Sequence, residues 1–278
     1  MQKYEVEGHE PSLLPEGRFS LVWADEFDGT ELDDSKWGFR LNMMQQRWVS
    51  WTDSKEALHL DGNSNAVFTL VEEENRLCCA QLQTGSNYMD QPLEQTKFGN
   101  DHLQWPIGSF QKQRFLHRYG YYECRCRLQQ KEGWWSAFWI QSPNIGSTET
   151  AEYSGSELDI MECFHPGHII SHNVFSGGYG RNVRRTTVGG TGNGEPLDKT
   201  IFHRFGILWT PKGYTFYVDG VEDGKVECDV SAVPEFILIS TEVIGYRYRH
   251  HVPVRQAFDA VGDTFLVDYV RVFDLVED

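Results

Sequence analysis

The clearest structural signal in this chain is GYYECRCRL, residues 120–128. Alternate residues from Tyr122 to Leu128 are apolar or carry a thiol, and they would share one face of an extended strand. Charged residues lie between them, from Glu123 to Arg127, and would share the opposite face. A period of two with one face suited to a core is typical of an antiparallel sheet.

Short runs of β-branched and aromatic residues recur on both sides of this stretch, separated by Gly, Pro, Asn and Asp, and helical periodicity is scarce. Such spacing indicates a β-sandwich or barrel. We predict further strands over residues 66–71, 76–82, 134–141, 157–164, 169–175, 201–209, 214–218, 236–243 and 264–273. Asp219 and Gly220 separate two of these runs and predict a two-residue hairpin turn. The polar stretch 84–104 and the Gly-rich stretch 176–194 are predicted to be loops.

Length and composition fit one all-β unit. The chain has 278 residues, 26 of them glycine, and 14% of its residues are aromatic. All-β sandwiches often reach this size as one domain, and no internal repeat or flexible linker interrupts the sequence. We therefore expect a single β-sandwich domain over residues 1–278, with residues 1–17 as an N-terminal extension.

The net charge limits the possible partners. The chain carries 25 Lys and Arg against 41 Asp and Glu, a net charge of −16. This excludes general nucleic-acid binding and argues against docking on anionic membranes. No stretch approaches the roughly 18 consecutive apolar residues that span a bilayer. We expect no nucleic-acid partner and no membrane partner.

The N-terminal residues and the cysteines bear on the compartment. Residues 1–20 contain neither a basic segment nor an apolar segment of the kind that forms a signal peptide. The protein would then be cytosolic, or its leader would be absent from this chain. The six cysteines fit no CxxC pattern, so we expect no zinc ribbon. We expect them to be free, mostly buried thiols.

Three carboxylates concentrate in GSELDIMEC, residues 155–163, within a run otherwise suited to a buried strand. Burying charge is costly unless the charge is paired or used. On a regular strand Glu157 and Asp159 would share a face, whereas Glu162 would point to the other. One β-bulge between Asp159 and Glu162 would bring all three to one side. A solvated edge or a calcium site is the alternative interpretation.

Crowded carboxylates separate their pKa values, so that some stay ionised and one holds its proton near neutral pH. A glycosidase needs this combination, because a nucleophile and a proton donor must flank one bond. A separation of about 5–5.5 Å between the two carboxyl groups would make such an enzyme retaining.

The segment 155–163 resembles the catalytic motif of glycoside hydrolase family 16, Glu-x-Asp-x-x-Glu in its bulged form. Further segments similar to the family occur in the same order: residues 23–28 with Trp37, then 107–112, 119–123, 134–139, 203–209, 214–220 and 267–273. The resemblance implies a concanavalin A-like β-jelly roll of two curved antiparallel sheets, with a sugar-binding cleft on the concave face. It also implies that Glu157 is the nucleophile, that Glu162 is the acid/base, and that Asp159 hydrogen-bonds the nucleophile.

Further residues are candidates for substrate binding, and the resemblance supports the two tryptophans among them. Trp135 and Trp139 are four residues apart and would share a strand face, although packing between the sheets is the alternative for either ring. Asn173 follows the motif and is a candidate to bind sugar hydroxyls. Glu242 would contact a sugar or pair with an arginine across strands.

Two basic clusters, residues 181–185 and 246–251, stand out in an acidic chain. They would balance neighbouring acids in solvated loops, or bind sulfate or carboxylate groups on a polysaccharide. Arg184 is the candidate of this kind for substrate binding.

Members of the family often hold one calcium ion on the convex face. By resemblance, Asp268 would supply a carboxylate ligand there, and Glu26 and Gly62 would supply backbone oxygens. The ion would be structural, because calcium prefers several oxygen ligands. No cofactor is expected for catalysis.

The sequence thus predicts a retaining endo-β-glycosidase that hydrolyses a polysaccharide or oligosaccharide, with a β-1,3-glucan of the laminarin type favoured. One alternative is a galactanase of the agarase, porphyranase or carrageenase type, acting on a galactan that is sulfated or unsulfated. Another is a non-catalytic carbohydrate-binding protein on the same fold. Transglycosylation would use the same covalent intermediate as hydrolysis. We expect a monomer.

Overall fold

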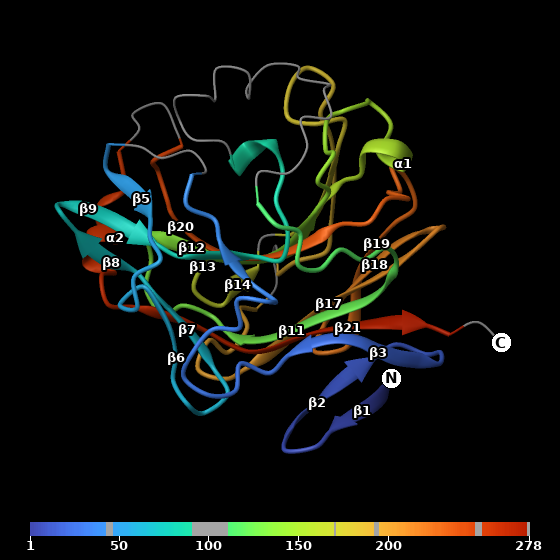
Figure 1. Cartoon of the computed structure of the whole chain (residues 1–278), viewed down its shortest axis with the longest axis horizontal. Coiled ribbons are helices and arrows are strands. Elements are labelled where there is room, and N and C mark those ends of the chain that lie inside the picture. Colours follow the sequence, from blue (N-terminus) through green and yellow to red (C-terminus); the bar gives the residue numbers. More distant parts are fainter. Residues whose placement is uncertain (43–46, 91–110, 170, 192–194, 248–251, 277–278) are drawn as a thin grey trace.

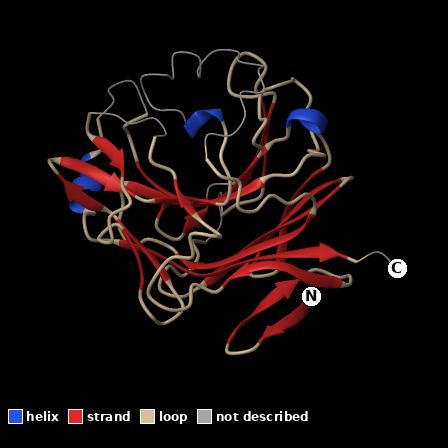
Figure 2. Ribbon diagram, viewed as in Figure 1, coloured by secondary structure: helices blue, strands red, loops and turns tan. Residues whose placement is uncertain are grey.

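The structure is a computed structural model, which describes residues 1–42, 47–90, 111–169, 171–191, 195–247 and 252–276. Two antiparallel sheets of eight strands each stack on one another (Figure 2). This is the sandwich that the alternating strands predict, and it agrees with the jelly roll that the resemblance implies. Among the described residues, no helix has the length and apolar character that crossing a bilayer would require.

One of the two main sheets, called the β13 sheet here, is the upper layer in Figure 1. Its strands lie in the order β16 (Arg184–Val188), β15 (His172–Ser176), β13 (Glu157–His165), β12 (Trp134–Gln141), β20 (Phe236–Val243), β10 (Gln81–Gln83) and β4 (Gly38–Phe39), and β14 (His168–Ile169) pairs with β13.

The other main sheet, called the β11 sheet, is the lower layer. Its order is β19 (Val221–Val226), β18 (Gly213–Val218), β17 (His203–Thr210), β11 (Gly120–Arg127), β21 (Thr264–Leu275), β7 (Ala66–Thr69) and β6 (Leu58–Leu60), and β3 (Phe19–Asp25) pairs with β21.

Smaller elements flank the sandwich. A hairpin of β1 (Gln2–Val6) and β2 (His9–Leu14) lies beneath the β11 sheet in Figure 1. A three-stranded sheet joins β5 (Val49–Trp51), β9 (Arg76–Cys79) and β8 (Val71–Glu73). The helices are short: η1 (Tyr88–Asp90), α1 (Ala151–Ser154) and α2 (Arg255–Asp259).

The main core lies between the two sheets. Tyr122, Cys124 and Cys126 of β11 are fully buried in it, as the alternation predicted, together with Phe138 and Ile140 of β12. Since side chains alternate along each strand, the next residues of β12 and β13 point away from the β11 sheet. That outer face of the β13 sheet is therefore free to carry polar chemistry.

Most predicted strands form, and the structure adds strands that were not predicted, among them β1, β2, β4, β5 and β6. Residues 184–188 were predicted to be loop but form the edge strand β16, paired along its length with β15. This edge strand is largely exposed, so its sequence lacks the apolar alternation that marks the inner strands. The runs 66–71 and 76–82 each divide into two strands. In the predicted loop 84–104, residues 88–90 form η1, and residues 91–104 lie outside the described residues.

The predicted hairpin turn is confirmed. Val218 pairs with Val221, and Asp219 and Gly220 between them have φ of +45° and +74°. A type I′ turn requires positive φ at both central positions, which Asp-Gly tolerates.

The expected state of the cysteines is also confirmed: all six are free, and five are buried, Cys228 being the exposed one.

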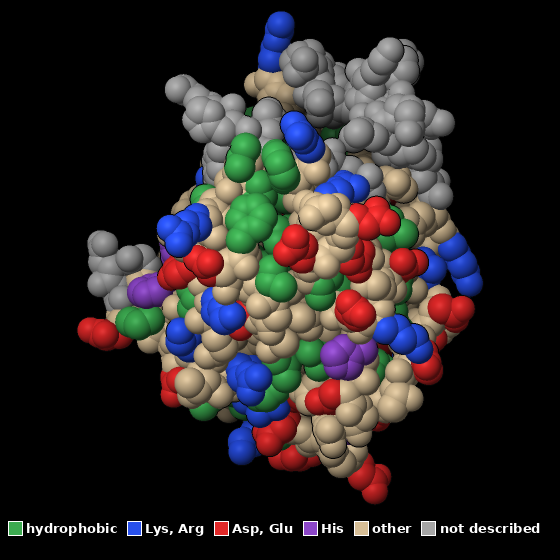
Figure 3. Space-filling view, turned by 90° about the vertical axis from the view of Figure 1, so that its left-hand side faces the viewer, with side chains coloured by type: hydrophobic (Ala, Val, Ile, Leu, Met, Phe, Trp, Pro, Cys, Tyr) green, Lys and Arg blue, Asp and Glu red, His purple; other side chains and the backbone are tan. Residues whose placement is uncertain are grey.

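The surface carries charges of both signs. Figure 3 shows lysine and arginine side chains interspersed with acidic ones over the face that it draws.

Candidate active site

A β-bulge in β13 brings the three carboxylates to one face. Across β12, Phe138 pairs with Met161 but Trp139 pairs with Asp159, so Ile160 is the extra residue of β13. In consequence Glu157 lies opposite Gln141, and Glu162 lies opposite Ala137. All three acids therefore share the outer face of the β13 sheet, and the predicted bulge is confirmed.

Glu157 lies among hydrogen-bond donors and cationic groups. Gln141 donates from Nε2 to its Oε2 at 2.8 Å, and the hydroxyl of Tyr179 donates to the same oxygen. Burial raises the pKa of Glu157, while the bond from Tyr179 and the charges of Arg247 and Arg40 oppose that rise. These partners favour the carboxylate form that a nucleophile needs.

Asp159 and Glu162, the other two acids, form a pair that shares a proton. Their carboxyl groups are hydrogen-bonded to each other. Burial, then the charge of Glu157, raises the pKa of Glu162 to about 7. Burial, then the charges of Glu162 and Glu157, raises the pKa of Asp159 well above its usual range. At neutral pH the pair therefore retains a proton that can be donated to a leaving group.

The sequence-based expectation places a hydrogen bond between Asp159 and the nucleophile, and that bond stays a prediction. In the structure Asp159 bonds to Glu162. Gln141 and Tyr179 supply donors to Glu157. Two neighbouring buried carboxyl groups are also stabilised by sharing one proton.

Asn173 holds Glu162. On β15, its Nδ2 donates to Glu162 Oε2 at 2.9 Å. Its Oδ1 accepts from Arg185 at 2.8 Å and from Thr187 at 2.9 Å. The side chain therefore orients the acid/base candidate. Its predicted contact with sugar hydroxyls stays a prediction, since Nδ2 carries a second N–H.

Both predicted tryptophans lie on the outer face with the acids, and each is 7% exposed. Trp139 donates from Nε1 to Ser240 Oγ at 2.9 Å. Trp135 stacks on Phe164 with ring centroids 4.8 Å apart, and the Arg247 guanidinium lies 5.5 Å from its centroid. The two rings therefore lie on the same face of the β13 sheet as the carboxylates.

Glu242 has the arginine partner that was its alternative role. It forms an ion pair with Arg247 and accepts from the Tyr246 hydroxyl at 2.5 Å. Residues 248–251 of that basic cluster lie outside the described residues. Arg184 has different partners from Arg247. It forms an ion pair with Asp229 at 2.8 Å and donates to the backbone oxygen of Glu149 at 2.7 Å.

Four residues of the site were not individually assigned to it from the sequence: Arg40, Gln141, Tyr179 and Arg247, of which the last lies in the basic cluster 246–251. Gln141 could have been found, because it ends a predicted strand on the same face as the two tryptophans. Tyr179 stands between glycines in a predicted loop, and the other two lie far from the motif in sequence. Their proximity to Glu157 is a product of the fold.

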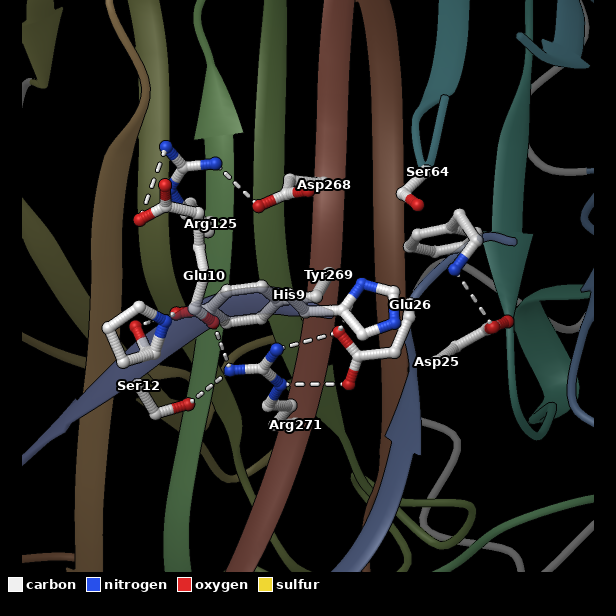
Figure 4. A network of polar contacts seen from close by, with 12 residues as sticks. His9, Glu10, Ser12, Asp25, Glu26, Ser64, Arg125, Asp268, Tyr269 and Arg271 are labelled. Carbon is white, nitrogen blue, oxygen red and sulfur yellow. Dashed lines mark hydrogen bonds and ion pairs between the residues drawn. The ribbon is translucent and has the colours of Figure 1, made fainter. Parts of the chain in front are cut away.

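Of the residues suggested for calcium, the Asp268 carboxylate is already engaged by an arginine, and the backbone oxygens suggested at Glu26 and Gly62 stay a prediction. The carboxylate of Glu26 pairs with Arg271 at 2.7 Å, and that of Asp268 pairs with Arg125 at 2.5 Å (Figure 4). Both carboxylates are thus already neutralised by guanidinium groups, whose charge would repel a divalent cation. No group of three or more His, Cys, Asp or Glu side chains suited to a metal occurs among the described residues.

Comparison with known proteins places this site in a family. The sequence profile of the glycosyl hydrolases family 16 matches residues 46–234, well over half of the chain. The chain is 27% identical over 277 residues to the glucan endo-1,3-beta-glucosidase A1 of Niallia circulans, covering 91% of this chain but only 38% of that protein. It is 26% identical over 279 residues to the beta-glucanase of Rhodothermus marinus, covering 93% of this chain and 86% of that protein.

A solved structure supports the fold. The X-ray structure of the laminarinase from Rhodothermus marinus has a TM-score of 0.67 at 22% identity, covering 95% of this chain and 100% of that one. The family match defines the class of protein as a glycoside hydrolase, and the three carboxylates lie on one face of the bulged strand. The chain belongs to the glycosyl hydrolases family 16.

Proposed function

We propose that this chain is a retaining endo-β-1,3-glucanase that hydrolyses a laminarin-like polysaccharide. The observation that carries the proposal is the bulge at Ile160, because it puts Glu157 and Glu162 on one face of one strand. The printed names of two relatives, a glucan endo-1,3-beta-glucosidase and a beta-glucanase, support the choice of substrate.

The reaction would proceed in two steps. In the first, the Glu157 carboxylate attacks the anomeric carbon, the glycosidic C–O bond breaks, and Glu162 gives its proton to the departing oxygen. A glycosyl ester on Glu157 results. In the second, the Glu162 carboxylate takes a proton from water, the water oxygen bonds to the anomeric carbon, and the Glu157 carboxylate is released. The configuration of the anomeric carbon is retained.

The pairing of the arginines favours a neutral glucan over a sulfated galactan. Arg247, beside Trp135, is paired with Glu242, and Arg184 is paired with Asp229. Arg185 donates to Asn173 and lies over Phe175. Guanidinium groups already engaged by carboxylates or amides have less capacity to bind an anionic substituent.

A polysaccharide panel tests the substrate. We expect laminarin to release reducing ends as short oligosaccharides, which chromatography of the products would show. Agarose, porphyran and carrageenan should release none. Cleavage of a sulfated galactan alone would overturn the glucan proposal. Binding to laminarin by calorimetry without any bond cleavage would support the carbohydrate-binding alternative.

The pH dependence of hydrolysis follows from Glu162. With its pKa at about 7, the acid form is present below pH 7 and is lost above it. We therefore expect kcat/KM to fall about tenfold per pH unit on the alkaline side of neutrality. Rate measurements from pH 4 to 9 would test this, with samples returned from pH 9 to pH 6 to confirm that the fold survives. A rate that stays flat to pH 9 would contradict the role of Glu162.

A further inference from the structure

A tyrosine from the Gly-rich loop reaches the candidate nucleophile. Tyr179 lies between β15 and β16, and its hydroxyl donates to Glu157 Oε2. Burial, then the charge of Glu157, raises the pKa of Tyr179 well above its usual range. The hydroxyl therefore keeps its proton and acts as the donor.

The orientation of this hydroxyl is fixed by a chain of side chains. Asn87 donates from Nδ2 to Gln141 Oε1 at 2.6 Å, which turns Gln141 Nε2 toward the acid. That nitrogen donates both to Glu157 and to the oxygen of Tyr179. With its oxygen accepting from Gln141, the Tyr179 hydroxyl directs its own proton to Glu157.

The backbone delivers Tyr179 by a path that needs glycine. Gly177 and Gly178 have φ of +75° and +79°. A Cβ atom on Gly177 would lie 2.3 Å from Asn182 O, and one on Gly178 would lie 2.9 Å from Gly146 Cα. Where the loop joins the two strands, Ser176 of β15 pairs with Arg184 of β16, and Arg184 forms an ion pair with Asp229. The loop is thus held at both ends.

We propose that Tyr179, oriented by Gln141, is a positioning residue that stabilises the ionised form of Glu157. This inference rests on the proposed glycosidase function and deepens it. A hydrogen bond to a carboxylate is strongest when the charge is complete. Glu157 loses its charge when the glycosyl ester forms and regains it when water breaks that ester. The Tyr179 hydroxyl therefore assists chiefly the second step, in which the carboxylate leaves.

The first test measures ionisation and needs no substrate. In carboxyl-labelled protein, the Glu157 resonance is assigned by its absence from Glu157→Gln and is titrated by ¹³C NMR. We expect Tyr179→Phe to raise the apparent pKa of Glu157 by about one unit. Tyr121→Phe is the matched control, because its hydroxyl hydrogen-bonds the buried carboxylate of Glu123 in the other sheet. An unchanged Glu157 titration in Tyr179→Phe would overturn the inference, whatever the polysaccharide panel shows.

The second test separates the two chemical steps. Its substrate is an aryl β-laminaribioside, in which an aryl alcohol is the leaving group. In Tyr179→Phe we expect kcat to fall about 10- to 100-fold, the size of a hydrogen bond to a charged group. KM should fall with it, and a burst of aryl alcohol should precede the slow steady state, because the glycosyl ester accumulates. Tyr121→Phe should show neither change. A loss confined to kcat/KM, or an unchanged kcat, would overturn the assigned role.

Discussion

Glu157→Gln is expected to abolish hydrolysis, lowering kcat/KM by about 10⁴-fold or more, while the protein stays folded. An amide cannot attack the anomeric carbon, and loss of a covalent nucleophile has effects of this size in other enzymes. The change preserves side-chain volume and removes a negative charge from a cluster of three buried acids, so stability should not suffer. Reducing-end assays and thermal melts would measure the two quantities.

A matched variant distinguishes chemistry from burial. Glu123 is also a fully buried glutamate, but it lies in the β11 sheet and accepts hydrogen bonds from Tyr269 and from the Leu13 backbone N–H. Glu123→Gln should lower stability and leave kcat intact. If Glu157→Gln retained substantial turnover, or if Glu123→Gln lost as much, the assignment of the nucleophile would fail.

Azide tests the stereochemistry that the two roles imply. In Glu157→Ala, azide can occupy the vacated position of the carboxylate and attack an aryl β-glycoside from that side, giving the α-glycosyl azide. In Glu162→Ala, azide instead attacks the glycosyl ester from the opposite side, giving the β-glycosyl azide. Proton NMR of the products would separate them. The reverse pattern would exchange the roles of the two glutamates.

Arg271→Met should destabilise the protein by about 3 kcal/mol, because it breaks a buried ion pair and leaves the other charge without its partner. Arg271 is fully buried and donates to Glu26 at 2.8 and 2.7 Å, to Glu10 O at 2.8 Å and to Ser12 Oγ at 3.0 Å (Figure 4). It therefore joins the β1–β2 hairpin to the β11 sheet. The melting temperature should fall by roughly 6–12 °C.

An exposed ion pair supplies the control for this variant. Lys55 and Glu31 lie 2.9 Å apart, and their side chains are 77% and 76% exposed. Lys55→Met should change the free energy of unfolding by less than about 0.5 kcal/mol. A calcium chelator should leave the wild-type melting temperature unchanged, since arginine neutralises Asp268 and Glu26. Equal effects of the two variants would contradict the buried role of Arg271.

Sequence reasoning succeeded where a local rule decides the structure. Alternation located β11, and the cost of burying Glu162 in the core predicted a bulge between Asp159 and Glu162, which the structure has at Ile160. The rule fails for β16, because an exposed edge strand needs no apolar face.

Contacts between distant segments could not be predicted in this way. Tyr179 meets Glu157 only because of the path of a loop. Arg271 meets Glu26 across 245 positions of sequence. No periodicity encodes such distances. For the same reason the arginine partners of Asp268 and Glu26 were not predicted.

Because only one of the six thiols is exposed, the protein can be labelled selectively for spectroscopy. Five are buried and Cys228 is exposed, with its Sγ 3.7 Å from Thr186 Oγ1 of β16. A maleimide dye should therefore label the folded protein at one position, without prior removal of other cysteines. That position adjoins the strand that follows the Tyr179 loop. Fluorescence from the dye would test whether this loop moves when laminarin is added.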